Sequence, residues 1–203
     1  MPRPARDSGQ GIRPVRQSGE CPPGIQPCLS SQAVTVIMPS RRVPVDLNAG
    51  TWFVTLTVQR WYYLFDRHNR WSILADSIRY CQGHKGLELN GYVFMLNHLH
   101  LLFTSPDSAG FLRDFKRFTS KQLKENLAAT EPSVLGLFVD TEGVYRLWMD
   151  TNAPKKIENP AFYVQKLNYV HENPVRKGYV ARAEHWVWSS ANPDSPLAVS
   201  ILG

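Results

Sequence analysis

The sequence has 203 residues, of which 43% are hydrophobic, 11% aromatic and 20% charged. This composition excludes a disordered or fibrous chain and fits one globular domain with a core of its own. The formal net charge is +6 and the isoelectric point about 9.3. This balance favours a polyanionic partner, because lysines and arginines that bind phosphates release the condensed counterions.

The sequence gives no sign of a targeting segment, a disulfide framework or a zinc site. No run approaches the roughly 20 apolar residues of a membrane-spanning helix, and no apolar signal-peptide core follows the N-terminal arginines. We therefore expect a cytoplasmic protein without membrane contact. Three cysteines fit no disulfide framework, and the pair in "CPPGIQPC" lacks a second pair for a zinc site. Free thiols are the expectation.

The N-terminal segment, residues 1–40, differs in composition from the rest. It contains seven of the fifteen prolines and four glycines, and it has no periodic apolar pattern. Such a segment buries too little surface to offset its ordering entropy, so we predict a flexible leader. Residues 41–190 are then the folded domain, and residues 191–203 an irregular tail.

The first predicted elements are a strand, a helix and a pair of strands. "TWFVTLTVQ" combines β-branched and aromatic residues and predicts a half-buried strand. Its buried face consists of Trp52, Val54, Leu56 and Val58. Residues 67–86 carry apolar residues at helical spacing and end at Gly86, as a helix C-terminus commonly does. "LELNGYVFML" and "HLHLLFTSP", separated only by the region of Asn97, predict an antiparallel pair of strands.

A second helix is predicted over residues 109–127, with an apolar and a basic side. The apolar side consists of Phe111, Phe115 and Phe118, and the basic side of Arg113, Arg117, Lys121 and Lys124. These four cations are candidate contacts to DNA phosphates, and a merely solvated basic face is the alternative. For residues 131–150 the pattern is ambiguous and predicts only short strands or loops.

A third helix is predicted in "ENPAFYVQKLNYVHENP". Asn159 is a good N-cap, Pro160 suits the first helical position, and Pro174 is expected to end the helix. Strands and helices in the order βαββα, with a later α, predict a largely antiparallel sheet with helices packed on it. The expected fold class is therefore α+β, a ferredoxin-like sandwich.

Two histidines, His98 and His100, lie one residue apart inside the apolar run "MLNHLHLLF". Side chains two apart on a strand point to the same face, so the two imidazoles could bind one metal ion. A pair of partly buried, hydrogen-bonded histidines is the simpler interpretation of the motif by itself.

The third helix supplies two further candidate site residues, a tyrosine and an asparagine. Its apolar stripe is Tyr163, Leu167 and Val170. Tyr169 falls about 120° from that stripe, and Asn173 lies within roughly 40° of Tyr169. The spacing therefore predicts a tyrosine and an amide together, away from the core face of the helix. An amphipathic boundary tyrosine is the alternative for Tyr169.

Five blocks of the sequence carry a resemblance to a known family. They are "GTWFVTLTVQR", "GYVFMLNHLHLLFTSP", "LRDFKRFTSKQL", "YVHENPVRKGYV" and "HWVWSS". In order and spacing they resemble the single-tyrosine HUH transposases of bacterial insertion sequences, and most closely the REP-associated tyrosine transposases. The resemblance covers residues 40–190. H-x-H together with a distant Tyr-Val-x-x-Asn-Pro-Val is far more specific than either part.

The resemblance implies a role for each candidate residue. His98 and His100 match the paired metal ligands, Asn173 the third ligand and Tyr169 the nucleophile. It also implies a ferredoxin-like fold, a single-stranded DNA substrate with foldback hairpins, and a covalent 5′-phosphotyrosine intermediate that permits strand transfer. The protein is then expected to act as a monomer or a homodimer.

The implied chemistry suits these residue types. A divalent ion held by two imidazoles and an amide oxygen can polarise a scissile phosphate, and Mg²⁺ or Mn²⁺ would fit. A phenol with an ordinary pKa of about 10 needs help to lose its proton. Lys166, one turn before Tyr169 on roughly the same face, is a candidate helper.

Two other functions are compatible with the sequence. One is a module of the same fold that binds DNA hairpins without cleaving them. The other is a zinc hydrolase that uses the same histidines, although it lacks a convincing general base. The leader and the stretch between the second helix and "RLWMD" match the family poorly, so no DNA sequence preference and no swapped dimer is predicted.

Overall fold

The computed structural model describes residues 49–150 and 154–201, so the predicted leader, residues 1–40, lies outside the described ranges. The main elements are β1 (Gly50–Thr57), α1 (Arg70–His84), β2 (Glu88–Phe94), β3 (His98–Ser105), α2 (Ser108–Thr130), α3 (Pro132–Leu135), β4 (Lys155–Lys156) and α4 (Pro160–Arg176). Three short 3₁₀ turns accompany them: η2 (Gln59–Trp61), η3 (Gly136–Phe138) and η4 (Ala183–His185). Within the described ranges no helix combines the length and apolarity needed to span a bilayer.

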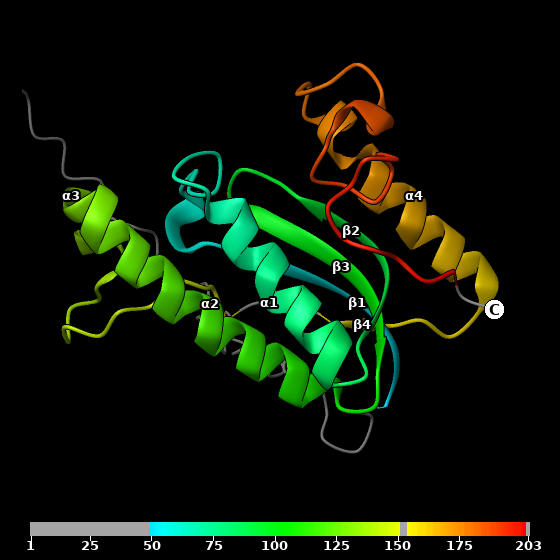
Figure 1. Cartoon of the computed structure of the whole chain (residues 1–203), viewed down its shortest axis with the longest axis horizontal. Helices are drawn as coiled ribbons and strands as arrows, with labels where there is room; N and C mark the ends of the chain where they lie inside the picture. The colour runs from blue at the N-terminus through cyan, green and yellow to red at the C-terminus, as the bar shows by residue number, and fades with distance from the viewer. Residues whose placement is uncertain (1–48, 151–153, 202–203) are drawn as a thin grey trace, which may run out of the picture. The chain divides into compact units, whose positions relative to one another are not determined.

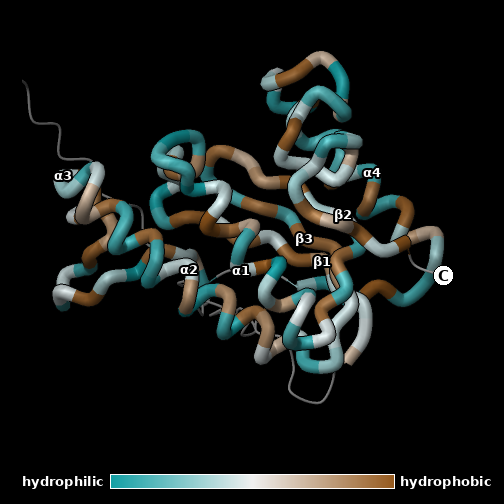
Figure 2. Tube along the Cα trace, viewed as in Figure 1, coloured by the Kyte–Doolittle hydropathy of each residue, from teal (hydrophilic) through white to brown (hydrophobic). Residues whose placement is uncertain are grey.

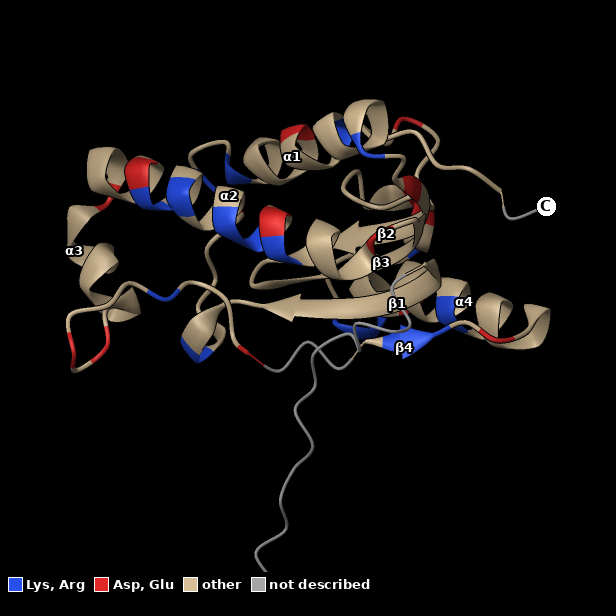
Figure 3. Cartoon of the chain, turned by 90° about the horizontal axis from the view of Figure 1, so that it is seen from below, with Lys and Arg blue, Asp and Glu red and all other residues tan. Residues whose placement is uncertain are grey.

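The four strands form one antiparallel sheet in the order β2-β3-β1-β4 (Figure 1). The central pair is in register from Gly50 opposite Ser105 to Thr57 opposite His98. Figure 3 shows α1 and α2 on one side of the sheet and α4 on the other. The predicted α+β sandwich with an antiparallel sheet is confirmed, and the βαββαβ succession within it is the ferredoxin-like arrangement.

Hydrophobic residues form a core on each face of the sheet, and much of the tube of the central strands is brown, the hydrophobic colour, in Figure 2. Toward α1 and α2, Leu101 packs with Phe115 in the larger core. Toward α4, Leu102 packs with Phe53 and Val170 in a smaller core. The prediction of a half-buried first strand is therefore wrong. Its second face lies under α4, where Phe53 is only 5% exposed.

Along α2 the buried stripe differs from the predicted one. Phe111 and Phe115 are buried as predicted, but Phe118 is 49% exposed. Thr119 takes the inward position instead, because the stripe advances by four residues from Phe115. The Thr119 hydroxyl donates to the Phe115 carbonyl oxygen at 2.7 Å, and it accepts from Nε1 of Trp148 at 3.1 Å.

Helix α4 begins as predicted and ends later than predicted. Asn159 Oδ1 accepts the backbone N–H of Phe162 at 2.8 Å, and Pro160 occupies the first turn. The prediction that Pro174 ends the helix is wrong, since α4 continues to Arg176. A proline this close to the C-terminus removes one helical hydrogen bond while little helix remains beyond it. The chain then turns at Gly178, whose φ is +71°.

The close approach of α4 to β2 depends on Gly91. A Cβ atom at this position would lie 2.6 Å from Cδ1 of Leu167. Gly91 also follows an irregularity in the pairing of β2 with β3, between Leu89 and Gly91. A glycine here therefore lets α4 lie directly on the sheet, over the face to which His98 and His100 point.

The remaining segments are short or irregular. Residues 131–150 form α3, η3 and two isolated bridges, Val139 with Tyr145 and Val58 with Trp148. The tryptophans of "HWVWSS" are packing residues. The Trp188 ring lies 5.5 Å from that of Trp71, and Nε1 of Trp186 donates to the Phe94 carbonyl oxygen at 2.8 Å. Residues 191–201 contain neither helix nor strand.

Candidate functional site

Strand β3 brings His98 and His100 together on the α4 side of the sheet. Their ring centroids are 5.0 Å apart, and the residues are only 8% and 3% exposed. Leu99 and Leu101 point to the opposite face, into the larger core. This is the arrangement that the two-residue period of a strand predicts.

The Nδ1 atoms of the two histidines each lie within hydrogen-bond distance of a neighbouring side chain. Asn97 Nδ2 donates to the Trp61 carbonyl oxygen at 2.7 Å, so its Oδ1, 2.7 Å from His98 Nδ1, must accept from that ring. Thr55 Oγ1 lies 2.8 Å from His100 Nδ1, and its hydroxyl oxygen can accept from that nitrogen. With Nδ1 protonated, Nε2 of each ring keeps its lone pair, which is the tautomer that a metal ligand requires.

Asn173 comes from α4 to the same point. Its Nδ2 lies 3.0 Å from Nε2 of His100. The residue is 6% exposed. The structure thus brings the three predicted ligands together. As oriented, the amide nitrogen faces the lone pair of His100, so a metal ion would replace this hydrogen bond and require Oδ1 in its place.

Burial keeps both imidazoles neutral. It lowers the pKa of His98 to about 4, and the charge of Lys177 acts in the same direction. It lowers the pKa of His100 to about 3, with smaller contributions from His98 and Lys166. At neutral pH both rings are therefore in the form that donates a lone pair to a metal.

These pKa values predict how the stability of the metal-free protein depends on pH. Between about pH 6.5 and pH 4 the unfolded chain binds protons at His98 and His100 that the folded chain does not bind. The free energy of unfolding should therefore fall as the pH falls through this window, by about 1.4 kcal/mol per pH unit for each histidine. Urea unfolding in a chelator, from pH 7 to pH 5, measures the slope. His100→Gln should lower this slope by the contribution of one histidine, about 1.4 kcal/mol per pH unit. Equal slopes in the two proteins would contradict a buried neutral His100.

Tyr169 lies against the histidines. Its ring packs edge-on against His100, with centroids 5.2 Å apart, and against Phe53 at 5.9 Å. The prediction that this side chain avoids the core face is therefore wrong. Toward its C-terminal end α4 turns Val170 and Asn173 to the sheet, and both are buried. The contact surface thus moves round the helix and includes Tyr169.

Two cations flank the tyrosine ring. Nζ of Lys166 lies 5.7 Å from the Tyr169 ring centroid, and Cζ of Arg176 lies 5.5 Å from it. Burial lowers the pKa of Lys166, and the neighbouring Lys155 lowers it further. Sequence reasoning found Lys166 and missed Arg176, although the position of Arg176 two turns after Tyr169 on the same helix was a usable signal.

The four basic residues of α2 that were predicted to contact DNA do not join this site. Arg113, Arg117, Lys121 and Lys124 are exposed on the helix that covers the opposite face of the sheet (Figure 3). Asp114 lies 3.2 Å from Arg113 and 4.0 Å from Arg117, and Glu125 lies 4.0 Å from Lys121. Acidic side chains thus interrupt the basic face, and its contact with DNA stays a prediction.

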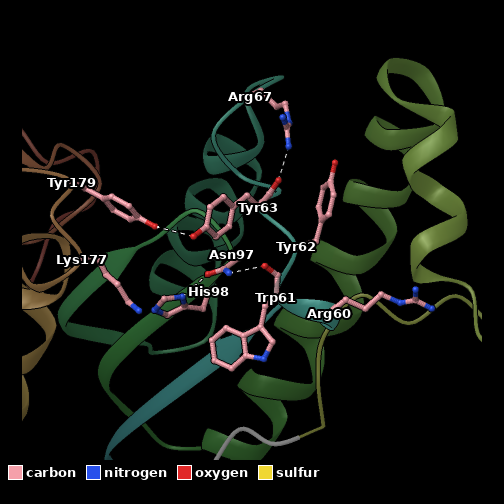
Figure 4. A pocket seen from close by; sticks show the side chains of 9 residues that line it. All are labelled: Arg60, Trp61, Tyr62, Tyr63, Arg67, Asn97, His98, Lys177 and Tyr179. Atoms are coloured by element: carbon pink, nitrogen blue, oxygen red, sulfur yellow. Dashed lines mark hydrogen bonds between the residues drawn. The ribbon is translucent and has the colours of Figure 1, made fainter. Parts of the chain in front are cut away.

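A cavity of about 590 Å³ opens beside His98 (Figure 4). It is lined by Arg60, Trp61, Tyr62, Tyr63, Arg67, Asn97, His98, Lys177 and Tyr179. Sequence reasoning missed this cavity. The signal available was "RWYY", one arginine and three aromatic residues shortly after the first strand. In the described part of the chain no group of three His, Cys, Asp or Glu side chains could hold a metal. The donors at this site are two imidazoles and one amide.

Comparisons with known proteins bear on the fold and on the family that the chain resembles. No protein family model matches the chain. The REP-associated tyrosine transposase of Escherichia coli (strain K12) is 23% identical over 149 residues, which are 73% of this chain and 80% of the relative. A solved structure of a REP-associated tyrosine transposase bound to a REP hairpin shares the fold, with a TM-score of 0.52 and 21% identity. The match covers 77% of this chain and 89% of the chain in that structure. The predicted resemblance to the REP-associated tyrosine transposases is confirmed.

Proposed function

We propose that this chain, as a relative of the REP-associated tyrosine transposases, cleaves and rejoins single-stranded DNA through a covalent 5′-phosphotyrosine intermediate. One observation carries the proposal: Tyr169 packs on His100, whose Nε2 lies 3.0 Å from Asn173. A nucleophile and a donor set from separate elements thus meet at one point. The substrate inferred from the similar protein solved with a REP hairpin is a DNA strand that carries a foldback hairpin.

The reaction exchanges one phosphodiester for another. The phenol oxygen of Tyr169 attacks the scissile phosphorus, the new O–P bond forms, and the bond from phosphorus to the 3′ oxygen breaks. The phenol proton leaves to a base, and the departing 3′ oxygen takes up a proton to become a hydroxyl. The phosphotyrosine retains the bond energy, so a 3′ hydroxyl can reverse the attack and join strands without an added energy source.

The donor set fits a divalent ion, Mg²⁺ or Mn²⁺. His98 and His100 are neutral, their Nδ1 atoms are held by Asn97 and Thr55, and both Nε2 atoms keep a lone pair. Together with Oδ1 of Asn173 they would hold the ion. When bound, it would polarise the scissile phosphate and offset the charge that develops there. The chain itself positions Tyr169 against His100 and Phe53.

Lys166 is the candidate base for the Tyr169 proton. Burial among Phe53, Phe162 and Tyr169 lowers its pKa, so a larger fraction is deprotonated near neutral pH than for an ordinary lysine. Lys166→Met should slow formation of the covalent product roughly 10²-fold, the lower range for general acid–base catalysis. In this variant the pH–rate profile should also lack the increase in rate that accompanies deprotonation of Lys166.

Two matched variants sharpen this measurement. Lys156→Met removes an exposed lysine of β4 and should leave the rate unchanged. Lys166→Arg keeps a cation beside the ring but cannot act as a base at these pH values. If arginine restores the rate, Lys166 contributes only its charge, and the assignment as a base is wrong.

The direct test of the proposed function uses single-stranded DNA with a foldback hairpin and unpaired flanks, incubated with the protein and Mn²⁺. A DNA-linked protein band on a denaturing gel, absent with a chelator, is the expected result. The same sequence as a full duplex serves as the control substrate and should give no band. Intact DNA with retained hairpin binding would instead support a binding module without cleavage.

A further inference from the structure

The turn that follows β1 holds an exposed indole next to the histidines. Arg60 and Trp61 both have left-handed backbone angles, with φ of 59° and 56°. Residues with side chains rarely adopt this region, and those that do cluster at ligand-binding sites. Trp61 is 60% exposed, and its ring centroid lies 6.3 Å from that of His98. The fold thus keeps a large apolar ring in solvent at the edge of the candidate site.

One buried side chain ties this turn to His98. The Asn97 amide donates to the Trp61 carbonyl oxygen through Nδ2 and accepts from His98 through Oδ1, each at 2.7 Å (Figure 4). Asn97 is 7% exposed. The Trp61 backbone and the orientation of the His98 imidazole are therefore held by the same group, so the turn that carries the indole is part of the site.

The cavity beside these residues suits an anion that carries a flat ring. Lys177 points toward His98 from the end of α4, one turn after Asn173, whereas Arg60 extends away from His98 (Figure 4). No aspartate or glutamate is among the described residues that line the cavity. The cavity between α1 and α2, in contrast, includes Asp76 and Asp114. The cavity beside His98 has a volume of about 590 Å³, in the range of sites for small ligands.

We infer that this cavity is a subsite for one unpaired nucleotide that flanks the scissile phosphate. Its base stacks on Trp61, and its phosphate faces Lys177. The inference rests on the proposed function, because it requires a single strand to run past His98. Stacking on an aromatic face tolerates any base, so the subsite holds the strand in place without reading its sequence.

The experiment measures the affinity of fluorescein-labelled single-stranded DNA with a foldback hairpin by fluorescence anisotropy. Tyr169→Phe is the parent protein, so that no covalent product forms. Adding Trp61→Ala should weaken binding roughly 5- to 150-fold, the effect of removing one base–aromatic stack. Trp61→Phe should restore most of the affinity. Tyr80→Ala, which removes a similarly exposed aromatic from α1 (57% exposed), should change nothing.

A series of DNAs with a single abasic position in the unpaired flanks locates the contact. One position should weaken binding to the parent protein and have no further effect on Trp61→Ala. Identical abasic profiles in both proteins, or an affinity loss for Trp61→Ala no greater than for Tyr80→Ala, would overturn the subsite.

Formation of the covalent product by proteins with Tyr169 intact separates the two proposals. Product formation with binding that does not depend on Trp61 would overturn the subsite alone. Trp61-dependent binding without any covalent product would support the subsite and overturn the proposed cleavage.

Discussion

Tyr169→Phe is expected to abolish the covalent protein–DNA product, lowering its rate of formation on the order of 10⁴-fold or more, since an enzyme without its nucleophile retains only binding. Phenylalanine keeps the ring that packs edge-on against His100 and Phe53. The fold and the affinity for hairpin DNA should therefore be unchanged. Denaturing gels measure the product, and anisotropy measures the affinity.

The matched control for this variant is Tyr163→Phe. Tyr163 lies on the same helix, and its hydroxyl donates to the Asn90 carbonyl oxygen at 3.4 Å, outside the histidine site. This variant should form the product at the normal rate. A covalent product that survives Tyr169→Phe would remove Tyr169 from the reaction.

The second large effect is expected at the metal site. His100→Ala, or a chelator added to the unaltered protein, should slow cleavage roughly 10²- to 10⁴-fold, because a bound ion contributes several kcal/mol to the stabilisation of developing charge. Mn²⁺ should support faster cleavage than Mg²⁺, since imidazole ligands favour the later metal. Cleavage rates in each ion and calorimetric titration with Mn²⁺ measure these effects.

His171→Ala is the control for loss of an imidazole. His171 lies on α4, not on β3, and is partly buried. Its Nε2 is 2.8 Å from Oγ of Ser190, away from His98 and His100. Mn²⁺ binding should be normal in this variant and absent in His100→Ala. Equal cleavage by the unaltered protein with and without a chelator would contradict a metal-dependent reaction.

The three long strands and the start of α4 were predictable from local chemistry, whereas the two-residue strand β4 was not predicted. The period of two in "HLHLLF" placed His98 and His100 on one face, and Asn159 capped α4 as its side chain allows. Phe118 and Pro174 were predicted wrongly for a shared reason. Burial of a ring and tolerance of a proline depend on what packs against the helix, and neighbours distant in sequence decide this.

The composition of the site was only partly predictable. The pairing of Tyr169 with the histidines came from the resemblance, because its geometry depends on how α4 lies on β2 at Gly91. Asn97, next to His98 in "NHLH", offered a signal for the residue that fixes the ring. The left-handed backbone at Trp61 could not be predicted, because no glycine or asparagine marks it.

The measurement that tests the central claim most directly is mass spectrometry of the DNA-linked protein after digestion with protease and nuclease. The account predicts a single modified peptide, with a 5′-linked nucleotide on the oxygen of Tyr169 and a free 3′ hydroxyl on the released strand. A nucleotide on any other residue, a 3′ linkage, or cleaved DNA without a linked peptide would contradict it.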